Sequence, residues 1–233
     1  MKSISLEKLL DRLGKAAFLT ALPDGMAVVD AVRTREAWLQ RYLPSPLVRR
    51  LDPGFARSCP VHPDTGRALY AICRALRPAH IFETGTYWGY STAYLAAAVR
   101  DNGTGCLHTF DIYARAGRHV PRTLRPHVRF YRGKSSVAAM PAVLQSASPS
   151  LFFQDSRHDY EGVFEEMSLA APNLAPGAVV LFHDFVVPDV RAAANDALGA
   201  GFEYFVLESG DPSQLGVAVK PAMKKSGNQG VKV

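Results

Sequence analysis

The chain has 233 residues, 48% of them hydrophobic, and a formal net charge of +6 with its seven histidines counted as neutral. This length and composition predict one globular domain with additions, and the lack of any apolar run of about 18 residues excludes a membrane-spanning helix. A basic chain can bind nucleic acid or an anionic substrate, but a solvated basic surface is the simpler interpretation.

The first third of the chain predicts helices without alternating strands. Residues 2–20 repeat apolar side chains at helical spacing, and residues 34–43 form a second helical segment that ends before a proline. We expect residues 1–63 to form a helical cap or an oligomerisation element, which makes a homodimer reasonable. Charges spread along the N-terminus argue against a signal peptide, and three scattered cysteines favour a reducing cytoplasm.

From residue 64 to residue 220, helical segments alternate with short apolar segments, which predicts a parallel sheet with right-handed crossovers. The expected strands are His80–Thr84, Cys106–Asp111, Val128–Arg132, Leu151–Asp155, Ala178–His183, Glu203–Leu207 and Leu215–Lys220. The expected helices are one from Asp64 or Thr65 to Arg77, Tyr90–Arg100, a broken one within Tyr113–Leu124, Ser135–Gln145, Tyr160–Leu174 and Val190–Leu198.

A turn-rich loop of residues 209–213 joins the last two expected strands, so we expect these strands to form an antiparallel hairpin. Residues 221–233 are rich in lysine and glycine and predict a flexible tail. The predicted fold is therefore an α/β domain whose parallel sheet is closed by one antiparallel hairpin.

Polar residues follow the carboxyl ends of the five parallel strands. Four of these strand ends carry Glu83, Asp111, Asp155 and the pair His183-Asp184, and Gly133-Lys134-Ser135 follows the remaining strand. Open α/β sheets bind their ligands outside these strand ends, and packing alone does not require acids there. The sequence therefore predicts a ligand site along this edge of the sheet.

The segment ETGTYWGYST, which begins at Glu83, joins a strand to an Ala-rich helix through Gly85 and Gly89. This arrangement presents backbone N–H groups and the positive end of a helix to a ligand. Its spacing matches neither the dinucleotide fingerprint nor a phosphate-binding loop, and a glycine turn of any α/β sheet is the simplest alternative. The segment resembles motif I of class I S-adenosylmethionine (SAM)-dependent methyltransferases. The nearest variant, E-x-G-x-x-x-G-x-S-T, is that of catechol O-methyltransferase-like enzymes and of related macrolide-sugar and cephalosporin-pathway enzymes.

Two later segments strengthen this resemblance, which covers about residues 65–220. FFQDSRHDY is similar to the family pattern I-D-G-x-H-x-Y and keeps Asp155 and His158, but it has Gln154 where an apolar residue is usual. LAPGAVVLFHD resembles L-x-P-G-G-x-x-x-x-H-D, with Ala178 in place of the second glycine. The resemblance implies a Rossmann-like, seven-stranded methyltransferase sheet with an N-terminal helical cap.

The resemblance also implies where SAM would bind. Asp111 would hold the ribose, because a carboxylate can accept hydrogen bonds from both hydroxyls of a diol. The expected cofactor-binding residues are Glu83, Gly85, Thr86, Gly89, Ser91, Asp111, Gly133, Ser135 and Asp155.

In the catechol-type enzymes a divalent cation is held at the ends of the fourth and fifth strands, which correspond here to Asp155, His183 and Asp184. We expect magnesium or manganese, although the imidazole of His183 suits manganese, iron or zinc better than magnesium. His183 could also be a non-ligand, or the site could be metal-free. Asp155 and His158 are the expected catalytic residues. His158 stands where those enzymes carry a general base, with a structural hydrogen bond as the alternative.

The sequence thus predicts a SAM-dependent methyltransferase that acts on a small-molecule, natural-product-like hydroxyl with the help of a cation. The alternatives are a metal-independent N- or O-methyltransferase that uses His158 and His183 as acid–base groups, and a non-catalytic SAM-binding protein. A segment without acids carries Arg115, Arg118, Arg122, Arg125, Arg129, Arg132 and Lys134. It predicts a solvated face or a site for an anionic acceptor, whereas nucleic acid is less expected because no RNA-binding module is recognisable.

Overall fold

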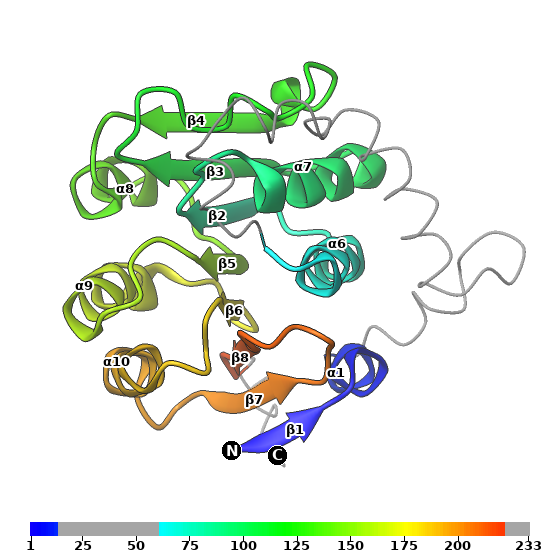
Figure 1. Cartoon of the computed structure of the whole chain (residues 1–233), viewed down its shortest axis with the longest axis vertical. Helices are drawn as coiled ribbons and strands as arrows, with labels where there is room; N and C mark the ends of the chain where they lie inside the picture. The colour runs from blue at the N-terminus through cyan, green and yellow to red at the C-terminus, as the bar shows by residue number, and fades with distance from the viewer. Residues whose placement is uncertain (14–60, 222–233) are drawn as a thin grey trace, which may run out of the picture.

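The computed structural model describes residues 1–13 and 61–221, so the expected helix at 34–43, most of the expected cap and the expected tail lie outside the described residues. In the described residues one eight-stranded sheet has the order β1-β7-β8-β6-β5-β2-β3-β4 (Figure 1). The strands are β1 (Lys2–Ile4), β2 (His80–Thr84), β3 (Cys106–Asp111), β4 (Val128–Arg132), β5 (Leu151–Gln154), β6 (Val179–Phe182), β7 (Glu203–Leu207) and β8 (Leu215–Val219). The helices are α1 (Leu6–Arg12), α6 (Pro63–Leu76), α7 (Tyr90–Asn102), α8 (Ser136–Leu144), α9 (Tyr160–Ala170) and α10 (Pro188–Leu198), with 3-10 turns η2 (Arg125–His127) and η3 (Ala171–Asn173).

The sheet is parallel except at β8, which runs antiparallel to both β6 and β7. This confirms the predicted α/β fold with an antiparallel C-terminal hairpin. The parallel connections bring the carboxyl ends of β2, β3, β4, β5 and β6 to one edge, where the predicted site residues lie. None of the helices in 1–13 or 61–221 has the length and apolar character needed to cross a membrane.

Strand β1 is an addition that the sequence did not predict. Residues 2–4 were expected to begin a helix, but they pair in parallel with β7, and the Ile4 side chain is buried. The hydroxyl of Ser5 accepts a hydrogen bond from the backbone N–H of Lys8, so the helix begins at Leu6. The expected seven strands thereby gain an eighth at the edge.

Helices cover both faces of the sheet, with α1, α6 and α7 on one face and α8, α9 and α10 on the other (Figure 1). Successive strand residues point to opposite faces, so Ile81 packs with the first group and Phe82 with the second. Burial on both faces explains why the central strands are almost continuous apolar runs. Among the described residues, Cys73 and Cys106 are free thiols.

Two predicted helices need correction. Helix α6 begins at Pro63 with His62 as its cap, because Asp64 and Thr65 direct their side chains to the loop after β7 instead. The segment Tyr113–Leu124 forms successive turns rather than a broken helix. Its Gly117 has a φ of 69° and donates its N–H to the carbonyl of Tyr87, which ties the segment to the glycine turn after β2.

Candidate active site

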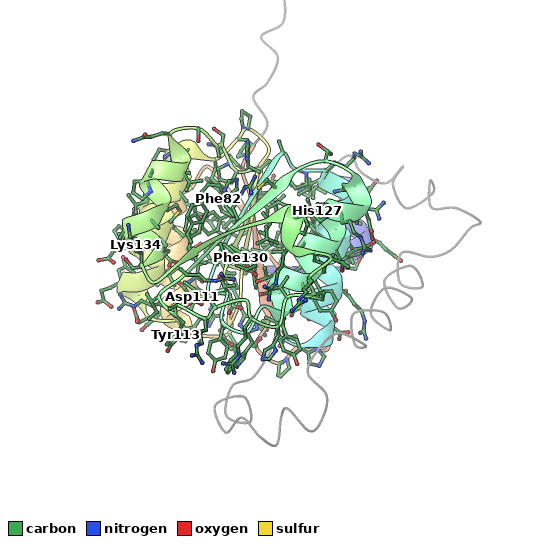
Figure 2. All side chains as sticks on the ribbon, turned by 90° about the horizontal axis from the view of Figure 1, so that it is seen from above. Phe82, Asp111, Tyr113, His127, Phe130 and Lys134 are labelled. Carbon is green, nitrogen blue, oxygen red and sulfur yellow. The ribbon has the colours of Figure 1, made fainter. Side chains whose placement is uncertain are left out.

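The carboxyl ends of β2, β3 and β5 surround a cavity of about 420 Å³, here called the cofactor cavity. Predicted residues Gly85, Asp111, Ser135, Asp155 and His158 line it. Figure 2 looks onto β4 and shows Asp111 and Tyr113 on the side of Lys134, away from His127 at the start of that strand. The topology therefore brings together residues that are up to 73 positions apart in the chain.

Gly85 lies in the turn after β2, between the ends of the neighbouring strands β3 and β5. Its N–H donates to the carbonyl of Phe110 at 3.0 Å, and its φ is 88°. A Cβ at this position would overlap the backbone carbonyl of Asp155. Only glycine therefore allows the turn to lie this close to the residue that follows β5.

A Gly85→Ala variant should lose roughly 2–5 kcal/mol of unfolding free energy, because it combines the left-handed backbone penalty with a clash against the main chain. Gly103→Ala is the matched control, since Gly103 also has a positive φ, of 67°, but has no atom within 4 Å of an added Cβ. That control should lose only roughly 1–2 kcal/mol. Urea unfolding of both variants measures the difference, and equal losses would contradict the proposed close approach.

Asp111 holds the turns on either side of the cofactor cavity. Its carboxylate accepts hydrogen bonds from the backbone N–H of Tyr87 at 2.6 Å and of Tyr113 at 2.7 Å, one on each oxygen. Each oxygen keeps a second lone pair. Because Asp111 lines the cavity, these lone pairs are available to a bound diol.

Glu83 lies beneath the glycine turn and is fully buried, so it does not line the cavity. Its Oε2 accepts hydrogen bonds from the hydroxyls of Thr92 and Thr109, both at 2.6 Å, while its Oε1 has no hydrogen-bond partner. Burial raises the pKa of Glu83 to about 7, against the lowering effect of the neighbouring hydroxyls. The structure therefore gives Glu83 a supporting position under the turn.

The raised pKa of Glu83 predicts a pH dependence of stability. Because the folded state binds this proton more tightly, its contribution is complete below about pH 4.5 and is lost as the pH rises through about 7. Relative to Glu83→Gln, which does not titrate, the wild type should lose about 3 kcal/mol between pH 4.5 and 7.5. Urea unfolding at both pH values measures this loss. A constant difference between the two proteins would contradict it.

The remaining predicted cofactor residues divide into two groups. Thr86, Gly89 and Ser91 line a smaller cavity of about 40 Å³, which shares Gly85 and Asp155 with the cofactor cavity. Gly133 lines neither cavity. Its place is the turn after β4, where its N–H donates to the carbonyl of Asp111.

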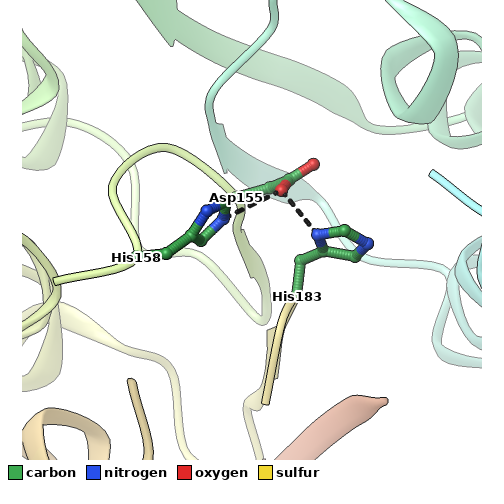
Figure 3. A group of neighbouring side chains, drawn as sticks. All are labelled: Asp155, His158 and His183. Carbon is green, nitrogen blue, oxygen red and sulfur yellow. Dashed lines mark ion pairs between the residues drawn. The ribbon is translucent and has the colours of Figure 1, made fainter. Parts of the chain in front are cut away.

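Four side chains at the ends of β5 and β6, here called the cation cluster, converge on one point: Asp155, His158, His183 and Asp184. His183 Nδ1 lies 3.0 Å from an oxygen of Asp155 and 3.2 Å from an oxygen of Asp184. His158 Nε2 lies 3.4 Å from the same Asp155 oxygen, toward which both rings point in Figure 3. His183 Nδ1 and His158 Nε2 are nevertheless buried without a hydrogen bond.

The cation cluster favours positive charge. Burial by itself lowers the pKa of His183, but the carboxylates of Asp155 and Asp184 outweigh it and raise the pKa to about 10. The Asp155 carboxylate also raises the pKa of His158. Asp184 has a φ of 50°, and non-glycine residues in this left-handed region concentrate at functional sites.

Residues 82–185 match the family of the methyltransferase domain. This stretch of the chain is similar to a methyltransferase domain. The match agrees with the resemblance to class I methyltransferases found in the sequence, because the matched residues include the glycine turn, Asp111 and the cation cluster.

Other proteins share part of this sequence or this fold. The chain is 32% identical over 130 residues, or 48% of its length, to the uncharacterized protein y4gI of Sinorhizobium fredii, and it spans only 14% of that protein. The solved structure of the O-methyltransferase TomG from Streptomyces achromogenes, in complex with SAM, has a TM-score of 0.61, 17% identity and coverage of 91% of this chain and 98% of TomG. The O-methyltransferase from Bacillus cereus, in complex with SAH, has a TM-score of 0.54, 16% identity and coverage of 89% and 96%. At these identities the structures share the fold.

The matched residues also contain a buried polar network that the sequence did not reveal. Glu166 of α9 accepts hydrogen bonds from the hydroxyls of Ser136, Ser156 and Thr84, and it lines the cofactor cavity. The amide of Gln154 donates to the carbonyl of Arg157 at 2.8 Å. The polar Gln154 inside an apolar strand was the only sign of this network in the sequence, because nothing marks one glutamate of a helix as buried.

A second cavity of about 280 Å³ adjoins the cofactor cavity and shares Tyr87 and Tyr113 with it. Trp88, Arg115 and Arg118 complete its aromatic and basic lining. The guanidinium carbon of Arg118 lies 3.5 Å from the centre of the Trp88 ring, a cation–π contact. Part of the predicted basic segment therefore lines a cavity.

Proposed function

We propose that this chain transfers the methyl group of SAM to a hydroxyl oxygen of a small, anionic molecule with the assistance of a divalent cation. One observation carries the proposal: a single cavity is bordered by the glycine turn, by Asp111 and by Asp155 and His158 of the cation cluster. A cofactor and an acceptor bound there would lie next to the groups that methyl transfer to oxygen requires. The SAM bound to TomG and the SAH bound to the Bacillus cereus protein support this cofactor.

The proposed cofactor position follows from the paired oxygens of Asp111. Both oxygens already hold backbone N–H groups, which fixes the carboxylate in one orientation. A ribose presents two adjacent hydroxyls, and each can donate to a remaining lone pair of this carboxylate. The reacting end of SAM would then lie along the glycine turn toward Asp155, which borders both cavities at that turn.

The donor atoms of the cation cluster fit a divalent ion. Ligands that share one ion through bonds of about 2.0–2.2 Å stand about 3 Å apart, and His183 Nδ1 lies 3.0 Å from an oxygen of Asp155 and 3.2 Å from an oxygen of Asp184. Two ring nitrogens there have no hydrogen bond. We assign the ion to Asp155, His183 and Asp184, and imidazole favours manganese, iron or zinc over magnesium. When bound, such an ion favours the deprotonated form of an acceptor hydroxyl.

His158 is the proposed general base. Its side chain is 36% exposed, whereas that of His183 is 12% exposed, so His158 is the more accessible of the two rings to an acceptor. It lines the cofactor cavity beside Asp155. We propose that a ring nitrogen of His158 takes the proton of the acceptor hydroxyl, while Tyr87, Tyr113 and Arg115 of the second cavity hold an anionic acceptor.

A screen with methyl-labelled SAM and hydroxylated acceptors, with and without carboxylate or phosphate groups, tests the proposal. We expect an oxygen-methylated product and SAH, with the rate lost in EDTA and restored by manganese. Methylation of nitrogen, or full activity in EDTA, would favour the metal-independent alternative that uses both histidines. Binding of SAM without turnover of any acceptor would favour a non-catalytic protein. The homodimer, the cytoplasmic location and the absence of a nucleic-acid partner stay predictions.

A further inference from the structure

The loop between β7 and β8, residues 208–214, reaches from the far end of the chain to the cation cluster. It is anchored on the first turn of α6, where Asp64 accepts a hydrogen bond from the N–H of Gly210 at 2.8 Å. The hydroxyl of Thr65 donates to Asp211, whose side chain is buried. The loop therefore has a fixed position beside His183, and it lies outside the residues that match the methyltransferase domain.

The hydrogen bonds of this loop have a defined direction. Ser213 donates its hydroxyl to Asp211 Oδ1 at 2.6 Å, and its backbone N–H donates to the same oxygen at 2.9 Å. The hydroxyl oxygen of Ser213 lies 3.2 Å from His183 Nε2. A hydroxyl has only one hydrogen, and here the carboxylate takes it. Ser213 can therefore only accept from His183, so Nε2 of this ring carries a hydrogen.

This tautomer has a consequence for the other ring nitrogen. Because a hydrogen stays on Nε2, the proton that a bound cation can displace from this ring is the one on Nδ1, and its loss leaves the lone pair there. Nδ1 is buried, has no hydrogen bond and lies 3.0 Å and 3.2 Å from oxygens of Asp155 and Asp184. Two carboxylates beside Nδ1 favour a positive charge at this point, which the ring proton or a cation that replaces it supplies. The arrangement is that of a histidine prepared as a ligand.

We propose that Asp211 and Ser213 form a positioning relay that fixes the tautomer of His183 and presents its Nδ1 to a transition-metal ion. The inference rests on the proposed cation site and adds two residues to it. Partners of this kind orient a ligating histidine and raise its basicity, and their loss typically weakens metal binding 10- to 100-fold. The relay also favours manganese, iron or zinc, because magnesium gains little from an imidazole.

Manganese titration of the full-length protein, followed by electron paramagnetic resonance of the free ion, tests the relay. Ser213→Ala should bind manganese roughly 10- to 100-fold more weakly than the wild type, with SAH affinity unchanged. Ser213→Thr keeps the hydroxyl and should restore manganese affinity. Ser209→Ala is the matched control, because this serine lies in the same loop and its hydroxyl contacts the N–H of Asp211 rather than His183. Wild-type affinity in Ser213→Ala would overturn the relay.

Nitrogen-15 spectra of the histidine rings in the zinc-loaded protein give a readout that a merely structural role would not change. We expect His183 to keep its hydrogen on Nε2 and to bind zinc through Nδ1, and binding through Nε2 would overturn the relay. A wild type that binds SAH but none of these ions would overturn both the relay and the cation site, while SAM binding stands. A wild type that binds neither would overturn the proposed function as well.

Discussion

A His158→Ala variant is expected to lose roughly 10²- to 10⁴-fold in the rate of methyl transfer, the usual contribution of a general base. Its affinities for SAH and manganese should stay close to those of the wild type, because Asp155, His183 and Asp184 remain in place. Single-turnover rates with an acceptor from the screen measure the loss. The physical reason is that His158 is the accessible ring beside the cofactor cavity, whereas His183 is held by Ser213.

Two further variants show whether the loss in His158→Ala comes from the general base or from the cation site. Asp155→Ala should lose both manganese binding and turnover, because Asp155 belongs to the cation cluster and to the cavity wall. His127→Ala should change neither manganese binding nor turnover, since His127 precedes β4 and so lies at the amino ends of the parallel strands, away from the site. Unchanged turnover in the His158→Ala variant would show that His158 is not the general base. A loss of manganese affinity as large as that of Asp155→Ala would make His158 a ligand instead.

Replacement of Asp111 by alanine is expected to weaken SAH binding by at least about 100-fold. Two hydrogen bonds from ribose hydroxyls to a charged group are worth about 3 kcal/mol or more together. Titration calorimetry measures the affinity. A thermal unfolding curve must accompany it, because the variant also leaves the N–H groups of Tyr87 and Tyr113 without their acceptor.

The matched control for Asp111 is Glu203→Ala. Glu203 begins β7 at the opposite edge of the sheet and forms an exposed ion pair with Arg12, so its loss should cost no more than about 1 kcal/mol of stability and leave SAH binding unchanged. A folded Asp111→Ala protein with an SAH affinity within about threefold of the wild type would show that Asp111 does not hold the ribose.

The seven strands predicted from the sequence agree with the structure to within one residue at each end. The central strands were predictable because strands buried on both faces are almost continuous apolar runs, and helical segments separate them. Strand β1 was not predictable, because its three residues pair with β7 about 200 positions later. The turns within 113–124 were missed for a related reason, since the partner that orders them is the carbonyl of Tyr87 in another loop.

The site residues likewise include some whose positions the sequence could predict and others whose positions it could not. Asp155, His183 and Asp184 could be brought together from the sequence, because parallel strands place their carboxyl ends along one edge. Glu83 also lies at the carboxyl end of a parallel strand, but its side chain is buried beneath the glycine turn. The direction of that side chain could not be predicted from the sequence. Asp211 was beyond reach, because the β7–β8 loop has no motif and meets His183 only in the folded chain.

The central claim is that SAM binds at the strand ends, and equilibrium dialysis with labelled SAM tests it most directly. The method detects binding whatever its enthalpy, and it needs no acceptor. We predict one saturable site per chain, displacement of the label by SAH, and loss of that site in Asp111→Ala but not in Glu203→Ala. A folded wild-type protein that retains no label, with or without manganese, would contradict the claim, and the acids at the strand ends would then require another ligand.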